Sequence, residues 1–285
     1  MGILFALIWS SAFSSARIIV AAAPPLLTLS IRFFIAGIIG VCIARFFGQT
    51  FFLTRGQWKA TVIFGVFQNA LYLGLNFLGM QTVEASLASI IASSMPLMVA
   101  FAGWVIFRER LSFLAGVGLF LGFLGVAMIM GLRITSGADT YGLLLCVLGS
   151  MALTVATLAV RGASEGGNVM MVVGLQMIIG AASLAIVGSL TEKVYVSWSL
   201  PFILAFVYTT LVPGLAATLI WFKLVNRIGT VKAATFHFLN PFFGVVIAAF
   251  VLGEAMTLLD FIGVIVITIG ILAVQMSRQS NSTDG

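Results

Sequence analysis

The sequence predicts an all-α integral membrane protein that crosses the bilayer ten times. Of its 285 residues, 61% are hydrophobic and only 8% are charged, and the mean hydropathy is +1.21. An ordinary soluble domain carries about 25% charged residues. A water-soluble fold of this length could not hide so much apolar surface in one interior. The composition therefore excludes soluble enzymes, nucleic-acid-binding proteins and secreted modules.

Ten apolar segments follow one another along the chain, each close to the ~20 residues that a helix needs to cross the hydrocarbon core. They are roughly residues 2–21, 26–46, 59–78, 84–106, 111–131, 141–160, 169–189, 200–222, 231–251 and 256–276. Turn-forming sequences separate them, beginning with Ala23-Pro24-Pro25, which cannot continue a helix. The connections are short, so consecutive helices are expected to run antiparallel.

The basic residues orient these helices. With the N-terminus inside, the cytoplasmic side holds ten of them: Arg45, Arg55, Lys59, Arg108, Arg110, Arg161, Lys223, Arg227, Lys232 and Arg278. The other side holds four, namely Arg17, Arg32, Arg133 and Lys193. Cytoplasmic loops of membrane proteins carry the excess of Lys and Arg. Both termini are therefore predicted to be cytoplasmic, with residues 277–285 as a cytoplasmic tail.

The second half of the chain echoes the first at an offset of 145 residues. Pro96 corresponds to Pro241, Glu109 to Glu254, and Gly118 to Gly263. Five helices per copy is an odd number, so the second copy must be inserted upside down. We therefore expect two inverted repeats, residues 1–140 and 141–276. Inverted repeats are typical of alternating-access transporters, which bind substrate near the midplane between the halves.

Several motifs in the first half carry a resemblance to a known family. The run from Phe77 to Ile129 contains a proline in the fourth predicted helix, the turn Arg108-Glu109-Arg110-Leu111 and a glycine-rich fifth helix. Together with Trp9-Ser10-Ser11 and Arg32-Phe33, it resembles the drug/metabolite transporter superfamily. The sequence is most similar to the ten-helix EamA-type bacterial exporters, and among them to the amino-acid exporter branch typified by YddG. The resemblance implies a central cavity between the repeats, export of small metabolites such as amino acids, and a bacterial inner-membrane location.

Large polar and aromatic side chains at mid-depth are the candidate substrate-binding residues. Polar groups in the hydrocarbon region must face protein or a wet cavity. The candidates are Trp9, Ser11, Arg32, Asn69, Tyr72, Asn76, Gln176 and His237. The aromatic rings would enclose an apolar side chain, Asn76 and His237 would bond the ends of a zwitterion, and Arg32 would favour its carboxylate. Interhelical hydrogen bonding is the alternative for the uncharged polar groups, and a structural role is the alternative for Arg32.

Pro96 and Pro241 lie near the middle of the fourth and ninth predicted helices, at equivalent repeat positions. Proline removes an intrahelical hydrogen bond and kinks the helix. We expect these two residues to act as hinges or to line the cavity, with a simple packing kink as the alternative. His237 is the one mid-depth residue that titrates near neutrality, and no carboxylate lies at that depth. The sequence therefore favours facilitated transport or exchange over proton coupling.

No metal, cofactor or catalytic residue is predicted, because Cys42 and Cys146 lie in apolar runs without metal-ligand neighbours. The expected partners are a small-molecule substrate and the lipid bilayer, without nucleic acid, for a monomer or weak homodimer. A sugar-phosphate or nucleotide-sugar exchanger is the alternative function, although it would need more mid-depth cations than Arg32 and Lys232. A drug exporter on the same fold, a channel or scaffold, and an intramembrane enzyme are the others.

Overall fold

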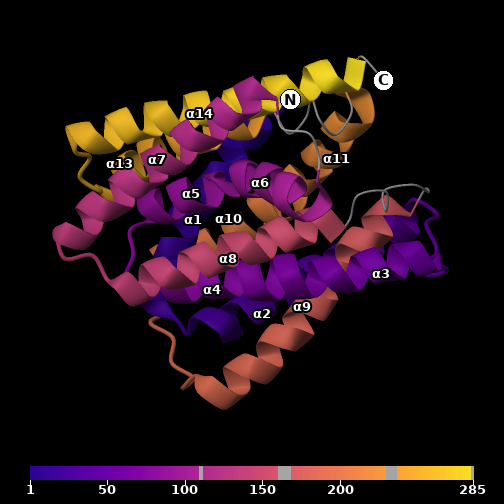
Figure 1. Ribbon diagram of the computed structural model, residues 1–285. Coiled ribbons are helices and arrows are strands. Elements are labelled where there is room, and N and C mark those ends of the chain that lie inside the picture. Colours follow the sequence, from indigo (N-terminus) through magenta and orange to yellow (C-terminus); the bar gives the residue numbers. More distant parts are fainter. Residues whose placement is uncertain (109–111, 160–167, 229–235, 284–285) are drawn as a thin grey trace.

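The computed structural model describes residues 1–108, 112–159, 168–228 and 236–283, and within them the chain is helical, without strands (Figure 1). The helices are α1 (Gly2–Ala22), α2 (Pro25–Phe46), α3 (Arg55–Ile63), η1 (Phe64–Tyr72), α4 (Leu73–Gly79), α5 (Ala85–Ser93), α6 (Met95–Phe107), α7 (Phe113–Thr135), α8 (Thr140–Ala159), α9 (Val169–Thr191), α10 (Leu200–Thr209), η2 (Thr210–Ala216), α11 (Ala217–Ile228), η3 (Phe236–Leu239), α13 (Asn240–Leu252) and α14 (Leu258–Thr283).

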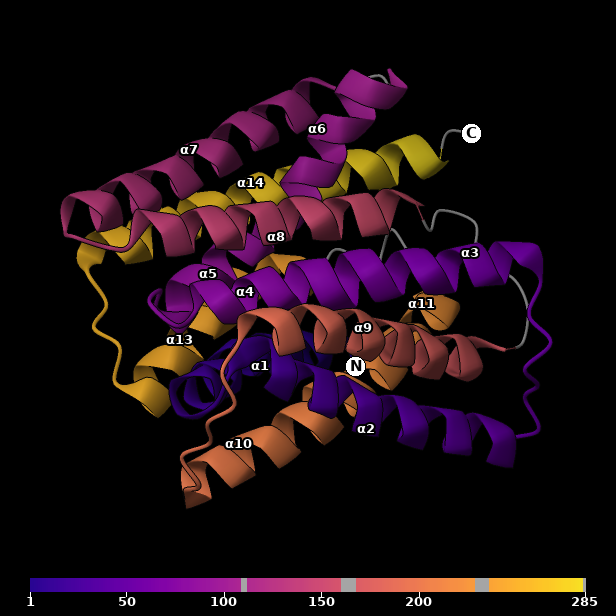
Figure 2. The same ribbon diagram turned by 90° about the horizontal axis from the view of Figure 1, so that it is seen from below.

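The described helices combine into nine segments that are long and apolar enough to cross a membrane, and Phe236–Leu252 is a shorter apolar helix. The nine segments follow the predicted order, which confirms the all-α membrane fold. The shorter helix corresponds to the predicted ninth span, residues 231–251, and ends one residue beyond it; the first residues of that span lie outside the described part of the chain. The described connections between the spans lie at the two ends of the bundle (Figure 2).

Local sequence explains where several helices begin. Pro25 starts α2 at a position where proline's missing N–H would have no helical partner anyway. Thr54 and Gln57 form a capping box at the start of α3, each side chain bonding the other's backbone. Ser112 and Ser199 cap α7 and α10 in the usual way, with the side-chain oxygen accepting from a backbone N–H.

The two mid-span prolines mark breaks, and not simple kinks, in the fourth and ninth spans. Helix α5 ends at Ser93, and α6 restarts at Met95 with Pro96 in its first turn. Likewise η3 ends at Leu239, and α13 restarts at Asn240 with Pro241 in its first turn. The restarted helices both end in the left-handed conformation, at Arg108 with φ 54° and at Gly253 with φ 68°. These residues are also 145 positions apart.

Two spans contain π-helical segments that the sequence did not predict. Segment η1 occupies residues 64–72, and η2 occupies residues 210–216. Shifting the first range by 145 residues gives 209–217, which encloses the second. Pro213 inside η2 is a visible cause of irregularity there. π-Helical turns inside α-helices are frequent at functional sites.

Helices that lie 145 residues apart in the sequence pack against each other as antiparallel pairs. Helix α2 packs on α9, and α7 packs on α14; the second pair lies along the upper edge of Figure 1. Glycines permit the close approach, since a Cβ built on Gly118 would lie 2.7 Å from the carbonyl oxygen of Gly270. In the first pair, Gly37 and Gly174 meet in the same way, at 3.0 Å. Small residues at such contacts are typical of helices packed within a membrane.

Candidate substrate cavity

A cavity of about 70 Å³ lies at the centre of the bundle. It is bounded by α1, α2, η1 with α4, α9, and η2 with α11. Its described lining residues are Trp9, Ala12, Phe13, Ala16, Arg32, Phe33, Gln68, Asn69, Tyr72, Leu73, Asn76, Phe77, Met80, Met177, Pro213, Gly214 and Thr218. Both halves of the chain therefore contribute to one site. The volume is well below the roughly 300–1,000 Å³ of pockets that enclose drug-sized ligands, so a substrate of that size requires the cavity to enlarge.

Helical spacing explains how one face of each element reaches the cavity. Helix α1 presents Trp9, Phe13 and Ala16, which are three or four residues apart. Segment η1 and the following α4 present Asn69, Tyr72 and Asn76 at a similar spacing. Both π-helical segments contribute lining residues, so the irregular backbone lies where it faces the cavity.

Arg32 is the cation of the described lining. Arg32 is only 6% exposed. Its guanidinium carbon lies 4.7 Å from the ring centroid of Phe33 and 5.9 Å from that of Phe77. The Nε atom is buried without a hydrogen-bond partner. Arg32 forms no ion pair with any carboxylate that the structure describes. The cavity thus holds a desolvated cation supported by aromatic faces and free to pair with an anionic group.

Two buried amides add hydrogen-bonding capacity. Asn69 Nδ2 donates to the backbone carbonyl of Gln176 at 3.0 Å, which joins η1 to α9. Asn76 Nδ2 donates to the carbonyl of Tyr72 at 2.9 Å. The Oδ1 atom of Asn76 is buried and has no partner among the described residues. An unpaired buried acceptor is costly, so Asn76 is suited to accept a hydrogen bond from a bound ammonium group.

His237 lies behind the cavity wall and is absent from its lining. Its ring meets Phe5, Trp9 and Trp221 edge-on, with centroids 5.4, 6.2 and 5.3 Å away. Its Nδ1 is 2.8 Å from Asn240 Nδ2. His237 therefore contacts Trp9, the lining residue, rather than the cavity space itself. The direct substrate contact expected of His237 stays a prediction.

The other predicted residues divide into those that line the cavity and those that do not. Trp9, Arg32, Asn69, Tyr72 and Asn76 line the cavity, and their binding of substrate stays a prediction. Ser11 instead pairs with the hydroxyl of Tyr208 at 2.6 Å, and Gln176 meets Asn69 through its backbone carbonyl. Pro96 and Pro241 are also absent from the described lining. Each lies in the first turn of a restarted helix. Their role as hinges stays a prediction.

Sequence reasoning missed several lining residues. Gln68 precedes Asn69 and shares its mid-depth position, which was a usable signal. Pro213 and Gly214 belong to η2, and the proline inside a predicted span was a second signal. The apolar residues Phe33, Phe77 and Met177 gave none, because most residues of such a chain are apolar.

Comparison with known proteins agrees with this architecture. Residues 1–131 and 140–276 match the EamA-like transporter family. The chain belongs to the EamA-like transporter family. It is 26% identical to the Uncharacterized transporter YvbV of Bacillus subtilis over 275 residues, covering 96% of this chain and 90% of the relative. It is 25% identical to the Uncharacterized inner membrane transporter YedA of Escherichia coli K12 over 287 residues, covering 97% and 90%.

A solved crystal structure shares the fold of this EamA-like chain. The two superpose with a TM-score of 0.70 at 20% sequence identity, covering 98% of this chain and 96% of the other. With the family match and the apolar helices, this EamA-like chain is a multi-pass membrane transporter. The identity of its substrate rests on the chemistry of the cavity.

Proposed function

We propose that this transporter exports small organic metabolites, foremost amino acids with apolar or aromatic side chains, by alternating access through the central cavity. The observation that carries the proposal is Arg32, a buried cation without a described carboxylate partner, placed between aromatic rings in the lining. A carboxylate would pair with Arg32, and the Asn76 Oδ1 would accept from an ammonium group. Trp9 and Tyr72 would enclose an apolar side chain.

A phosphate-bearing substrate fits the described lining less well. A phosphate monoester carries close to two negative charges near neutral pH, whereas the described lining contributes one cation, Arg32. Burying the second charge without a partner would be expensive. The lining also contains the apolar rings of Phe13, Phe33 and Phe77. These favour a monocarboxylate with an apolar body over a sugar phosphate or nucleotide sugar.

The proposed alternating access rests on two inverted five-helix repeats, residues 1–140 and 141–276. Three features support it. The family matches two successive segments of the chain. The helix breaks and π-helical segments recur at an offset of 145 residues. Equivalent helices also pack antiparallel, as a two-fold axis in the membrane plane would require.

Transport by purified protein in proteoliposomes tests the proposed substrate class. Liposomes preloaded with unlabelled leucine or phenylalanine should accumulate the labelled amino acid by exchange, well above protein-free liposomes. Glucose 6-phosphate and a nucleotide sugar should not exchange. An imposed proton gradient should change the initial rate only modestly, because the described lining contains no carboxylate or histidine. Exchange of phosphates without exchange of amino acids would contradict the proposal.

The proposed orientation has both termini in the cytoplasm of a bacterial inner membrane. A cysteine replacing exposed Gly56 should be protected from an impermeant thiol reagent in intact cells, and one replacing exposed Ser136 should react. Ser136 is preferable to its neighbour Gly137, whose φ of 92° would strain any side chain. Permeabilised cells provide the control, since both positions should then react. Labelling at Gly56 in intact cells would reverse the orientation.

A further inference from the structure

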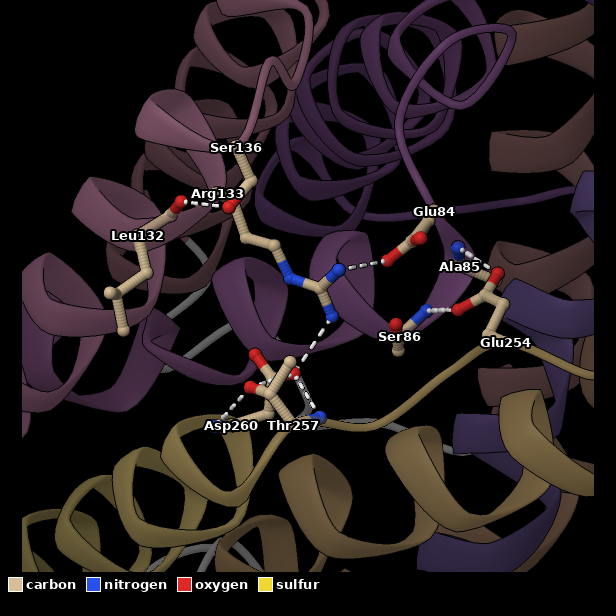
Figure 3. Close-up of polar contacts among 9 residues, drawn as sticks. All are labelled: Glu84, Ala85, Ser86, Leu132, Arg133, Ser136, Glu254, Thr257 and Asp260. Atoms are coloured by element: carbon tan, nitrogen blue, oxygen red, sulfur yellow. Dashed lines mark hydrogen bonds and ion pairs between the residues drawn. The ribbon is translucent and has the colours of Figure 1, made fainter.

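Four charged residues meet at the end of the bundle that carries the α4–α5, α7–α8 and α13–α14 connections. Arg133 Nη1 lies 2.9 Å from a carboxylate oxygen of Glu84, and its Nη2 lies 2.9 Å from Oδ2 of Asp260. Figure 3 shows the guanidinium of Arg133 pointing between these two carboxylates. Glu254 completes the group, which we call the clasp: Glu84, Arg133, Glu254 and Asp260.

Glu254 holds the start of α5 with both carboxylate oxygens. They accept from the backbone N–H groups of Ala85 at 2.7 Å and Ser86 at 2.9 Å (Figure 3). These are among the N–H groups that a helix leaves unpaired at its first turn, where a negative charge is also favoured. Glu84 is the N-cap residue of the same helix. The start of α5 is thus tied to α7 through Arg133 and to the α13–α14 connection through Glu254.

The pair between Arg133 and Asp260 is the better buried of the two ion pairs. The Asp260 side chain is 5% exposed and that of Arg133 is 19% exposed, whereas Glu84 is 41% exposed. Asp260 also accepts from the backbone N–H and the hydroxyl of Thr257 at 2.9 and 2.8 Å. Removing one partner from a buried charge pair leaves the other uncompensated. Arg133 and Asp260 are therefore the residues on which the clasp depends most.

The clasp joins the two family-matched segments at one end of the bundle only, as far as the described residues extend. Glu84 lies in the first matched segment, and Glu254 and Asp260 lie in the second. At the opposite end, the described polar contacts between the segments are uncharged, such as Gln49 with Met171 and Thr50 with Asn168. The described contacts at the two ends thus differ in chemistry.

We propose that the clasp holds this end of the bundle closed, and that the ion pairs of Arg133 separate when the transporter opens there. The inference rests on the proposed function, since alternating access requires each end to open in turn. The clasp would then set how readily the cavity is reached from this side.

Cysteine accessibility tests the clasp without knowledge of the substrate. In a background where Cys42 and Cys146 are replaced by alanine, Val245→Cys places a reporter beneath the clasp. Val245 is 2% exposed and lines a small pocket shared with Arg133 and Asp260. Ala156→Cys places a second buried reporter near the opposite end of α8. The protein is held in lipid nanodiscs, so that a polar maleimide reaches both faces.

In the Arg133→Gln and Asp260→Asn variants, the maleimide should label the Val245→Cys reporter about tenfold faster than it does without these substitutions. Glu254→Gln keeps an acceptor oxygen and loses the charge, so it should give a smaller increase in the labelling rate. It also replaces the other two variants as the test if they fold poorly. Lys193→Gln is the matched control, because Lys193 is an exposed cation at the same end for which the structure records no ion pair. It should change nothing, and the Ala156→Cys reporter should stay protected in every variant.

The pH dependence of labelling provides a second arm. Burial raises the pKa of Glu84 above its ordinary value, with Glu254 and Asp260 adding to the rise and Arg133 and Arg17 opposing it. Opening returns the carboxylate to water and restores its ordinary pKa, so the closed state binds the proton more tightly. Closing is therefore favoured as pH falls through the raised pKa, so the pair of Arg133 with the better buried Asp260, and not the pair with Glu84, holds the closed state. Labelling at Val245→Cys, normalised to a protein whose sole cysteine replaces the exposed Gly56, should slow on acidification, and Glu84→Gln should remove this dependence.

Two results would overturn the clasp. One is an unchanged labelling rate at Val245→Cys in folded Arg133→Gln and Glu254→Gln proteins. The other is an equal increase at both reporters, which would indicate general loosening of the bundle. Failure of the proposed function has a different signature: faster labelling at Val245→Cys alone, combined with absence of amino-acid exchange by the unmodified protein, would support the clasp and reject the substrate class.

Discussion

Replacing Arg32 by glutamine will weaken amino-acid binding about tenfold to a hundredfold. A hydrogen bond to a charged group contributes about 1.5–3 kcal/mol, and glutamine keeps polarity while removing the charge. The aromatic rings of Phe33 and Phe77 support the guanidinium. The described lining contains no other cation, so the lost contact cannot be replaced. The measurement is the concentration dependence of exchange in proteoliposomes, with the amino acid that the unmodified protein transports fastest.

Two variants show whether the effect depends on the cavity. Arg32→Lys keeps the charge but loses the planar fork that matches a carboxylate, so it should recover part of the affinity. Arg17→Gln removes an arginine that is not among the described lining residues and that donates to the backbone carbonyl of Met80, and it should leave affinity nearly unchanged. Normal exchange by Arg32→Gln would place the substrate carboxylate elsewhere.

Gly118→Val will destabilise the fold by disturbing the packing of α7 on α14. A Cβ at Gly118 would lie 2.7 Å from the carbonyl oxygen of Gly270 and 2.9 Å from the Cβ of Ala273. The nearest atom belongs to the backbone of α14 and cannot rotate away, so the whole helix must shift. Overpacking of this kind costs about 3 kcal/mol at the upper end of its usual range. The apparent melting temperature in detergent, followed by the loss of monodisperse protein on gel filtration, measures the change.

Gly131→Val is the matched control on the same helix. A Cβ at Gly131 has no other atom within 4 Å, and this glycine is not among those with positive φ. The substitution should therefore leave the melting temperature within a few degrees of the unmodified protein. Equal destabilisation by both variants would show that valine harms α7 for local reasons and that the contact with α14 is not the cause.

The fold was predictable from sequence because a membrane constrains it strongly. Apolar length fixed the helices, and residues such as Pro24 and Pro25 marked where they end. The cavity was partly predictable for the same reason: Arg32, Asn69 and Asn76 are costly in hydrocarbon, so each must face protein or a cavity. Five of the eight candidate binding residues do line it.

The remaining features depend on packing that a single sequence does not record. His237 is as polar as Asn76, yet its neighbours Phe5 and Trp221 enclose it behind Trp9. Those rings come from helices at opposite ends of the chain, so no local pattern indicates their contact. The clasp is similar, because Glu84, Arg133 and Asp260 come from three separate segments. Each was placed near a helix end, but their meeting could not be inferred.

The glycine contacts between α7 and α14 determine how substitutions in one half of the chain affect the contacts of the other half. A shift by 145 residues exchanges the contact of Gly118 with Gly270 for that of Gly263 with Gly125. This is the rule of an isologous interface, in which a surface meets a copy of itself, here contained within one chain. Between separate identical subunits, one substitution alters both contacts together. Within one chain each contact varies alone, and they already differ: a Cβ on Gly118 would lie 2.7 Å from the Gly270 oxygen, against 3.5 Å from Gly263 to the Gly125 oxygen.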